Sequence, residues 1–188
     1  IAESVRVTVI PVMNPDGLEA TVGTTGQFDI DEVSPSEADR VAGRFNANEV
    51  DLNRNFDCEW ASEGTWRNQT VSGGSAAFSE PEAAAVRDFV AELSPDRAVV
   101  WFSAEGTVYP SACGGDPSEA SIALANTYGT ASGLAVREEF DAYPITGDMV
   151  NWMAREGVPA ISVLMSDHET VNWNQHQAAI TAVINAAR

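Results

Sequence analysis

Val50-Asp51-Leu52-Asn53-Arg54-Asn55-Phe56 is the stretch around which the rest of the chain is interpreted, and it follows Gly43-Arg44-Phe45-Asn46 in a long polar region. The adjacent Asn53 and Arg54 place an amide next to a planar guanidinium that has five N–H donors. Such a pair can hold a carboxylate through two directional hydrogen bonds. The same residues also suit a solvated loop with an ordinary ion pair, so this stretch by itself leaves both interpretations open.

The composition limits the size of the fold and the kinds of partner. At 188 residues the chain is expected to form a single domain, 1–188, with a sizeable core. Its formal net charge is −18, and all 10 of its basic residues are arginines. Such an acidic surface repels nucleic acids and anionic membranes, so neither is an expected partner. No apolar run reaches transmembrane length, and no signal-peptide pattern is present.

The two cysteines, Cys58 and Cys113, do not form a CxxC motif or a Cys/His spacing of the kind that binds zinc. We expect a disulfide between two irregular loops, and two unrelated buried thiols are the alternative. A disulfide implies an oxidising compartment, so the expected location is extracellular or in the cell envelope.

Segments with strand and helix signals alternate along the chain. The predicted strands are residues 4–12, 97–102 and 159–165, and the last should be central because it is almost continuously apolar. Asn14-Pro15-Asp16-Gly17 is predicted to form a turn. This order predicts an α/β fold with a mixed, largely parallel sheet and helices on both faces.

Four helices are predicted between and after these strands. One opens at Ser79-Glu80-Pro81-Glu82 with Ser79 as N-cap, and a second opens in the same way at Asp116-Pro117-Ser118-Glu119. Two more are expected over residues 147–156 and 169–187. Residues 18–78 show little periodicity and are too long for a structureless connection, so part of this region should be functional loop.

Several short motifs now stand in one order along the chain: Pro11-Val12-Met13-Asn14-Pro15-Asp16-Gly17, Gly43-Arg44-Phe45-Asn46, residues 50–56, Ser79-Glu80-Pro81-Glu82, Phe102-Ser103, Tyr143, and residues 160–168. Together they resemble the zinc metallocarboxypeptidases of the carboxypeptidase A type, most closely the short bacterial members that trim peptides or peptidoglycan stems. The resemblance implies a carboxypeptidase-like sheet without the family's N-terminal strands, which must be closed differently or paired with another chain.

The resemblance also implies roles for individual residues in substrate binding. Asn53 and Arg54 would hold the free C-terminal carboxylate of a peptide. Arg44 would stabilise the developing oxyanion, and Tyr143 would fold over the bound substrate. In the family a zinc ion polarises the scissile carbonyl, and a glutamate acts as general base.

The chain departs from the family pattern at each position that makes the family an enzyme. The family's His-x-x-Glu motif is absent, Phe102 stands in place of the third zinc ligand, and Leu164 stands in place of the glutamate. We therefore predict no catalytic residue, no metal ligand and no cofactor. His168 and His176 are expected to be solvated or capping imidazoles, and a new metal site formed by them with Glu169 is not favoured because their spacing does not share one helical face.

Three functions remain open. The first is a carboxypeptidase-like domain that has lost zinc and hydrolysis but still binds peptide C-termini or peptidoglycan stem peptides, either as a natural pseudoenzyme or as an engineered, minimised scaffold. The second is an active zinc carboxypeptidase whose missing ligands come from another chain or fragment. The third is a purely structural or designed module without a ligand.

Overall fold

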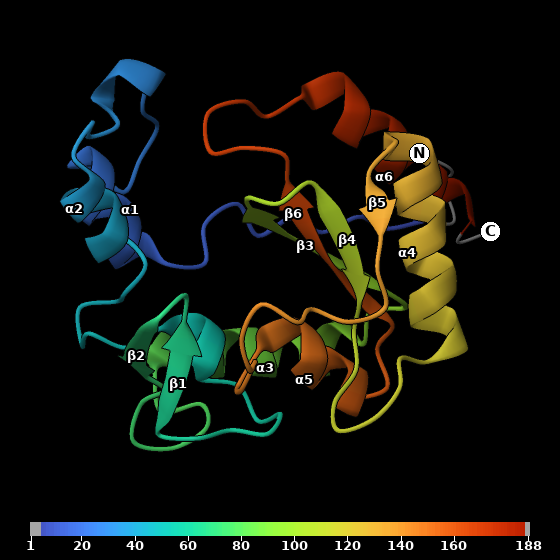
Figure 1. Cartoon of the computed structure of the whole chain (residues 1–188), viewed down its shortest axis with the longest axis horizontal. Coiled ribbons are helices and arrows are strands. Elements are labelled where there is room, and N and C mark those ends of the chain that lie inside the picture. Colours follow the sequence, from blue (N-terminus) through green and yellow to red (C-terminus); the bar gives the residue numbers. More distant parts are fainter. Residues whose placement is uncertain (1–4, 187–188) are drawn as a thin grey trace. The chain divides into compact units, whose positions relative to one another are not determined.

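The computed structural model describes residues 5–186, which divide into two compact units (Figure 1). Of these residues, the first unit takes those up to Val7, Leu93–Ala142 and those from Val150 on. The second unit takes Thr8–Glu92 and Tyr143–Met149. The expectation of a single domain, 1–188, stays a prediction.

A four-stranded sheet forms the centre of the first unit, in the order β3 (Ala98–Ser103), β6 (Ala160–Met165), β4 (Thr107–Pro110) and β5 (Ala135–Val136). β3 runs parallel to β6, and β4 runs parallel to β5, whereas β4 is antiparallel to β6. The sheet is therefore mixed and mostly parallel, and β6 lies in its interior, as predicted.

Helices α4 (Glu119–Ser132) and α6 (Trp173–Ala186) pack against each other beside the sheet (Figure 1). α4 begins after Ser118, whose hydroxyl accepts a hydrogen bond from the N–H of Ser121, and it ends at Gly133 with φ of 76°. The N-cap is thus Ser118 and not Asp116. The apolar side chains of both helices and of the strands form one core: Val108, Leu124, Ala125, Tyr128, Ile161, Val163, Ala179 and Val183.

The two histidines lie in different surroundings in the first unit. His176 is buried at 6% exposure, and its Nδ1 lies 2.6 Å from the hydroxyl of Tyr128, which also accepts a hydrogen bond from the indole of Trp101 at 2.9 Å. Burial lowers the pKa of His176. The expectation of a solvated or capping imidazole is therefore wrong for this residue. His168 is exposed, with its Nδ1 2.8 Å from the hydroxyl of Ser103.

The second unit consists of short helices and a hairpin: α1 (Pro15–Val22), η1 (Ile30–Glu32), α2 (Glu37–Ala42), η2 (Leu52–Arg54), β1 (Glu63–Trp66), β2 (Gln69–Ser72) and α3 (Pro81–Leu93), whose last residue already belongs to the first unit. α5 (Met149–Arg155) begins at the last residue of this unit and continues in the first. The region from 18 to 78 is thus built from several short elements, and not from one long loop.

Three local predictions are wrong. Residues 5–12 form no strand, because alternating β-branched residues give a strand only where a neighbouring strand accepts their backbone hydrogen bonds; residue 4 lies outside the described part. Asn14 does not start a turn but is the N-cap of α1. α3 begins at Pro81, so the preceding residue is Glu80, and the hydroxyl of Ser79 donates to the Glu80 carboxylate instead of capping the helix.

Both cysteines are disulfide-bonded, and neither is a free thiol, so the predicted disulfide is confirmed. Within residues 5–186, no helix combines the length and apolar character that crossing a membrane requires.

Candidate functional site

Arg54 ends the short helix η2 and is almost completely buried, with 1% of its surface exposed. Its Nε and Nη2 donate to the backbone carbonyl of Thr65 at 3.3 and 2.6 Å, and its Nη1 donates to the carbonyl of Asn53 at 2.8 Å. One N–H on each terminal nitrogen has no acceptor among the described residues. No described carboxylate pairs with this buried cation either.

Two glycines allow the arginine to lie where it does. A Cβ at Gly64 on β1 would stand 2.8 Å from the Cδ of Arg54, so the arginine stem passes directly over the hairpin. Gly147 has φ of 61°, and a Cβ there would collide with the backbone carbonyl of Arg54. The hairpin and the Tyr143–Met149 segment therefore enclose Arg54 through close contacts that only glycine permits.

Asn53 ties the Tyr143–Met149 segment to η2. Its amide donates to the carboxylate of Asp148 at 2.8 Å, and its amide oxygen accepts from the N–H of Met149 at 3.3 Å. The backbone of Gly147 adds two hydrogen bonds, from Phe56 at 3.0 Å and to Cys58 at 2.8 Å. These bonds hold the segment that carries Tyr143, whose ring centroid lies 6.0 Å from the guanidinium carbon of Arg54.

Arg44 is held by an acid and an indole. Its Nε and Nη2 both donate to the same carboxylate oxygen of Asp51, at 2.8 and 2.7 Å, and its guanidinium carbon lies 4.5 Å from the ring centroid of Trp66. Burial lowers the pKa of Arg44, Asp51 partly offsets this, and the nearby charge of Arg54 lowers the pKa further. The other oxygen of Asp51 accepts from the N–H of Asn53 at 3.1 Å, so one carboxylate orients both arginine-bearing segments.

The buried carboxylate of Glu80 is hydrogen-bonded to the loop between Arg44 and Asp51. Glu80 is 5% exposed and accepts hydrogen bonds from the amides of Asn46 and Asn48 at 2.8 and 2.7 Å and from the hydroxyl of Ser79 at 2.8 Å. Burial alone would raise the pKa of Glu80, but these three donors outweigh burial and lower it. Its backbone N–H donates to the side chain of Asn55, the residue after Arg54, at 3.0 Å.

The side chain of Asn14 is hydrogen-bonded to the backbone of the segment that carries Arg44. Its amide nitrogen lies 3.1–3.3 Å from the carbonyls of Gly43, Arg44 and Phe45, while its oxygen caps α1 by accepting from Gly17 at 2.9 Å. One side chain therefore begins a helix and fixes a loop about thirty residues further along the chain. This geometry explains why two motifs so distant in sequence occur together.

The second unit thus brings together all four residues that the sequence analysis singled out for substrate binding: Arg44, Asn53, Arg54 and Tyr143. Their roles stay predictions. Three residues that orient them were not predicted from the sequence, namely Asp51, Trp66 and Asp148. Asp51 stood in the quoted stretch as a polar residue between apolar ones, which was a usable signal. Trp66 and Asp148 gave none, because their contacts arise only from folding.

Phe102 and Leu164 lie directly opposite each other on the neighbouring strands β3 and β6 of the first unit. Neither side chain has a nitrogen, oxygen or sulfur atom, so this pair offers nothing to a metal ion or to a proton in transfer. Within the described part of the chain, no group of three or more His, Cys, Asp or Glu side chains is placed to hold a metal ion.

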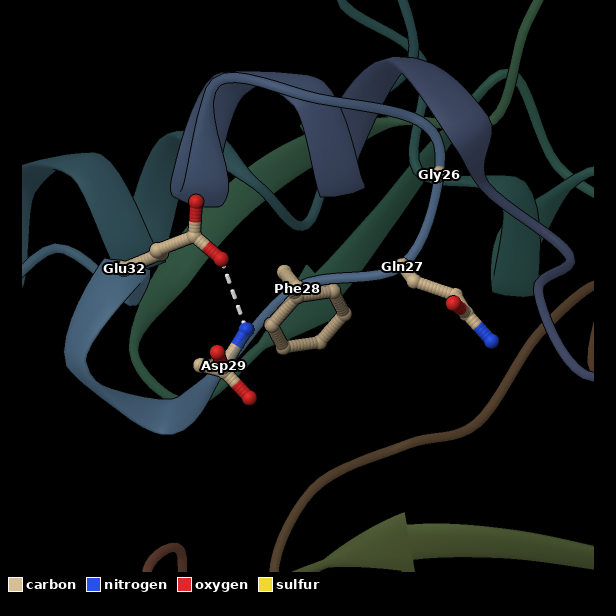
Figure 2. Close-up of a pocket in the computed structure, with 5 residues that line it drawn as sticks. All are labelled: Gly26, Gln27, Phe28, Asp29 and Glu32. Carbon is tan, nitrogen blue, oxygen red and sulfur yellow. Dashed lines mark hydrogen bonds between the residues drawn. The ribbon is translucent and has the colours of Figure 1, made fainter.

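A separate hollow of about 520 Å³ is formed by the segment that connects α1 to α2 in the sequence. Figure 2 shows the five residues that line it: Gly26, Gln27, Phe28, Asp29 and Glu32. Glu32 folds back to accept a hydrogen bond from the backbone N–H of Asp29 at 2.7 Å. None of the four predicted substrate-binding residues is among those that line this hollow.

A family model described as zinc carboxypeptidase matches residues 1–187. The chain belongs to the zinc carboxypeptidase family. The murein-tripeptide amidase MpaA from Escherichia coli O157 has a similar structure, with 21% identity, a TM-score of 0.62, and coverage of 94% of this chain and 65% of that one. Carboxypeptidase A from Helicoverpa armigera matches at 18% identity and a TM-score of 0.63, covering 95% and 51%.

Bovine thrombin-activatable fibrinolysis inhibitor is a third similar structure, at 18% identity and a TM-score of 0.55, with 73% of this chain and 54% of that chain covered. At such identities these likenesses show the fold alone. The chain spans less than two thirds of the length of each of these structures. No curated protein sequence matches it.

The family implies a zinc ion, and the side chains of Phe102 and Leu164 do not fit a zinc site. At two of the positions to which the resemblance points, Phe102 and Leu164 supply only carbon and hydrogen. Zinc requires nitrogen, sulfur or oxygen ligands, and the hydrolytic reaction of the family requires a proton acceptor beside it.

Proposed function

We propose that this chain binds the free C-terminal carboxylate of peptides and does not hydrolyse them. Arg54 is the group that receives the carboxylate, Asn53 borders it, and Tyr143 closes over the bound residue. The class of ligand is a short peptide or a peptidoglycan stem peptide with a free C-terminus. A location outside the cell or in the cell envelope accords with the disulfide.

The observation that carries this proposal is the buried guanidinium of Arg54, which has two unused N–H groups and no paired carboxylate among the described residues. A buried cation without a counter-charge is unfavourable, and a ligand carboxylate would relieve this cost while satisfying both donors. The unused N–H groups lie on the two terminal nitrogens, an arrangement that matches the two oxygens of a carboxylate.

The absence of hydrolysis follows from Phe102 and Leu164. Placing hydrocarbon where the family has a zinc ligand and a general base removes two groups whose burial without zinc would cost about 1–3 kcal/mol each. Phe102 and Leu164 are half-buried, so each contributes only part of the roughly 1.5–3 kcal/mol of a fully enclosed apolar side chain. The two substitutions accord with a fold that does not depend on zinc.

Isothermal titration calorimetry with a panel of short peptides, each prepared as the free acid and as the C-terminal amide, tests the proposal. We expect the free acids to bind at least tenfold more tightly, because only they can accept from both free N–H groups of Arg54. Equal affinities for acid and amide across the panel, or no binding of any acid, would exclude this function.

One observation favours a second candidate, an active zinc carboxypeptidase completed by another chain or fragment. The chain covers only 65% of the murein-tripeptide amidase structure, and this candidate places the remaining ligands on another chain or fragment. Phe102 and Leu164 oppose this candidate, since no added chain changes those two side chains. Stoichiometric zinc together with release of C-terminal residues that stops on chelation would establish it.

A further inference from the structure

Three arginines of the second unit cluster around Trp66 and its strand. The guanidinium carbon of Arg44 lies 4.5 Å from the indole centroid, and that of Arg67, at the exposed tip of the hairpin, lies 4.8 Å from it. Arg54 lies against the same hairpin at Gly64 and Thr65. A chain of net charge −18 therefore concentrates three cations around one aromatic ring and its strand.

Arg44 retains unused hydrogen-bond donors in this cluster. Asp51 occupies its Nε and Nη2, and within the described residues its Nη1 has no acceptor. Among the described residues, the buried side-chain nitrogen and oxygen atoms without a hydrogen-bond partner are Arg97 Nε and Thr146 Oγ1. Nη1 of Arg44 is not one of them, so it is accessible to solvent. Arg44 thus presents two N–H groups to an incoming ligand while Asp51 holds its other edge in place.

The charges in this cluster do not balance. Arg54 lies close enough to Arg44 to lower the pKa of its guanidinium, and Asp51 is the only carboxylate among the described residues that pairs with either of them. A ligand with one carboxylate would balance Arg54 and leave the charge of Arg67 beside Trp66 without a partner. A ligand with two carboxylates would balance that charge as well, and its second carboxylate would accept from Nη1 of Arg44.

We infer that the site prefers peptides whose last residue carries a second carboxylate, namely peptides ending in aspartate or glutamate. This inference rests on the proposed function: Arg54 receives the main-chain carboxylate, and Nη1 of Arg44 receives the side-chain carboxylate. The indole of Trp66 backs Arg44 and keeps its guanidinium in position. Arg67, at the exposed tip of the β1–β2 hairpin, forms the rim of the site and attracts the negatively charged ligand before it binds.

The test compares three peptides of equal length by calorimetry: one ending in Glu, one ending in Gln, both as free acids, and the Gln peptide as its amide. We expect the Glu peptide to bind about tenfold or more tightly than the Gln peptide, the gain of one charge-assisted interaction. The net charge of −18 repels the more acidic Glu peptide and would favour the Gln peptide. Tighter binding of the Glu peptide would therefore be due to the local arginine cluster.

Two conservative variants separate the cluster from general charge effects. Arg44→Lys keeps a cation beside Asp51 but loses the guanidinium fork, and we expect it to remove most of the Glu-over-Gln preference. Arg40→Lys, on α2 of the same unit and in no described ion pair, is the matched control and should retain the preference. Circular dichroism is used to check that both variants are folded.

Each outcome decides something. Equal binding of the Glu and Gln acids, or a preference that survives in Arg44→Lys, would overturn the inference while leaving the proposed function intact. Equal binding of the Gln acid and its amide, with no heat from the Glu peptide, would overturn both. A reduced preference in Arg67→Gln of up to about fivefold, the range of an exposed charge, would support the role of the rim.

Discussion

Among single residues, Asp51 is the one whose carboxylate contacts both arginine-bearing segments of the site. Its carboxylate is 2% exposed, pairs with Arg44 through one oxygen, and accepts the N–H of Asn53 through the other. Asp51→Asn keeps the shape but removes the charge, leaving the half-buried Arg44 without its partner. We expect a loss of roughly 1–3 kcal/mol in the free energy of unfolding, measured by urea denaturation. An unchanged unfolding midpoint would show that this pair does not hold the segment.

Glu80 provides a pH-dependent test at the same scale. Hydrogen bonds hold its pKa below the ordinary value of 4.5, so the folded protein binds this proton less readily than the unfolded chain. Its contribution is present above about pH 4.5 and is lost as the pH falls through the folded pKa. Glu80→Gln should lose about 1–3 kcal/mol at pH 7 and show a shallower loss on acidification. Parallel pH profiles for the two proteins would contradict this expectation.

The residues of the candidate site were predictable only in part. The motif carrying Asn53 and Arg54 pointed to carboxylate binding because an amide beside a guanidinium has that chemistry in any fold. The acid that pairs with Arg44 and the indole beside it could not be assigned, since hydrogen-bond partners depend on which loops fold together. Burial of His176 was missed for the same reason, because Tyr128 lies far from it in sequence.

Among the elements, the hairpin of β1 and β2 forms the wall against which Arg54 lies. A Cβ at Gly64 would stand 2.8 Å from the Cδ of Arg54, so Gly64→Ala must push the side chain away. We expect at least tenfold weaker binding of free-acid peptides and a loss of roughly 1–3 kcal/mol in the free energy of unfolding, because the buried Arg54 loses hydrogen bonds when it moves; calorimetry and thermal melting measure the two effects. Gly115→Ala is the control, since a Cβ there meets nothing within 4 Å and affinity should be unchanged. Equal affinities for the two variants would rule out this role of the hairpin.

Elements with strong local signals were predicted well. The continuous apolar run of β6 appears where expected, and α4 begins within the predicted capping stretch of residues 116–119. The short strands β4 and β5 were missed, and residues 5–12 were wrongly predicted as a strand. Strand formation depends on a neighbour that the local sequence does not specify.

At the scale of the whole molecule, the chain has the fold of its family, and Phe102 and Leu164 stand at two positions where the resemblance implies a zinc ligand and a general base. The motif order predicted the α/β fold and the family from sequence, whereas the arrangement of the sheet needed the structure. If the chain acts without metal, chelator treatment should leave both the melting temperature and the peptide affinity unchanged, and added zinc should produce no release of C-terminal residues. Chelator-sensitive turnover, followed by amino-acid analysis, would contradict this account.

The central claim is that the guanidinium of Arg54 receives a ligand carboxylate, and replacing it with another cation tests this most directly. Arg54→Lys retains a positive charge but loses the two N–H groups that no described residue uses. The decisive quantity is the ratio of Kd for a C-terminal amide to Kd for the matching free acid, measured by calorimetry on the folded variant. The account predicts that this ratio falls from at least tenfold to about one. A ratio as large in Arg54→Lys as in the unaltered protein would contradict it.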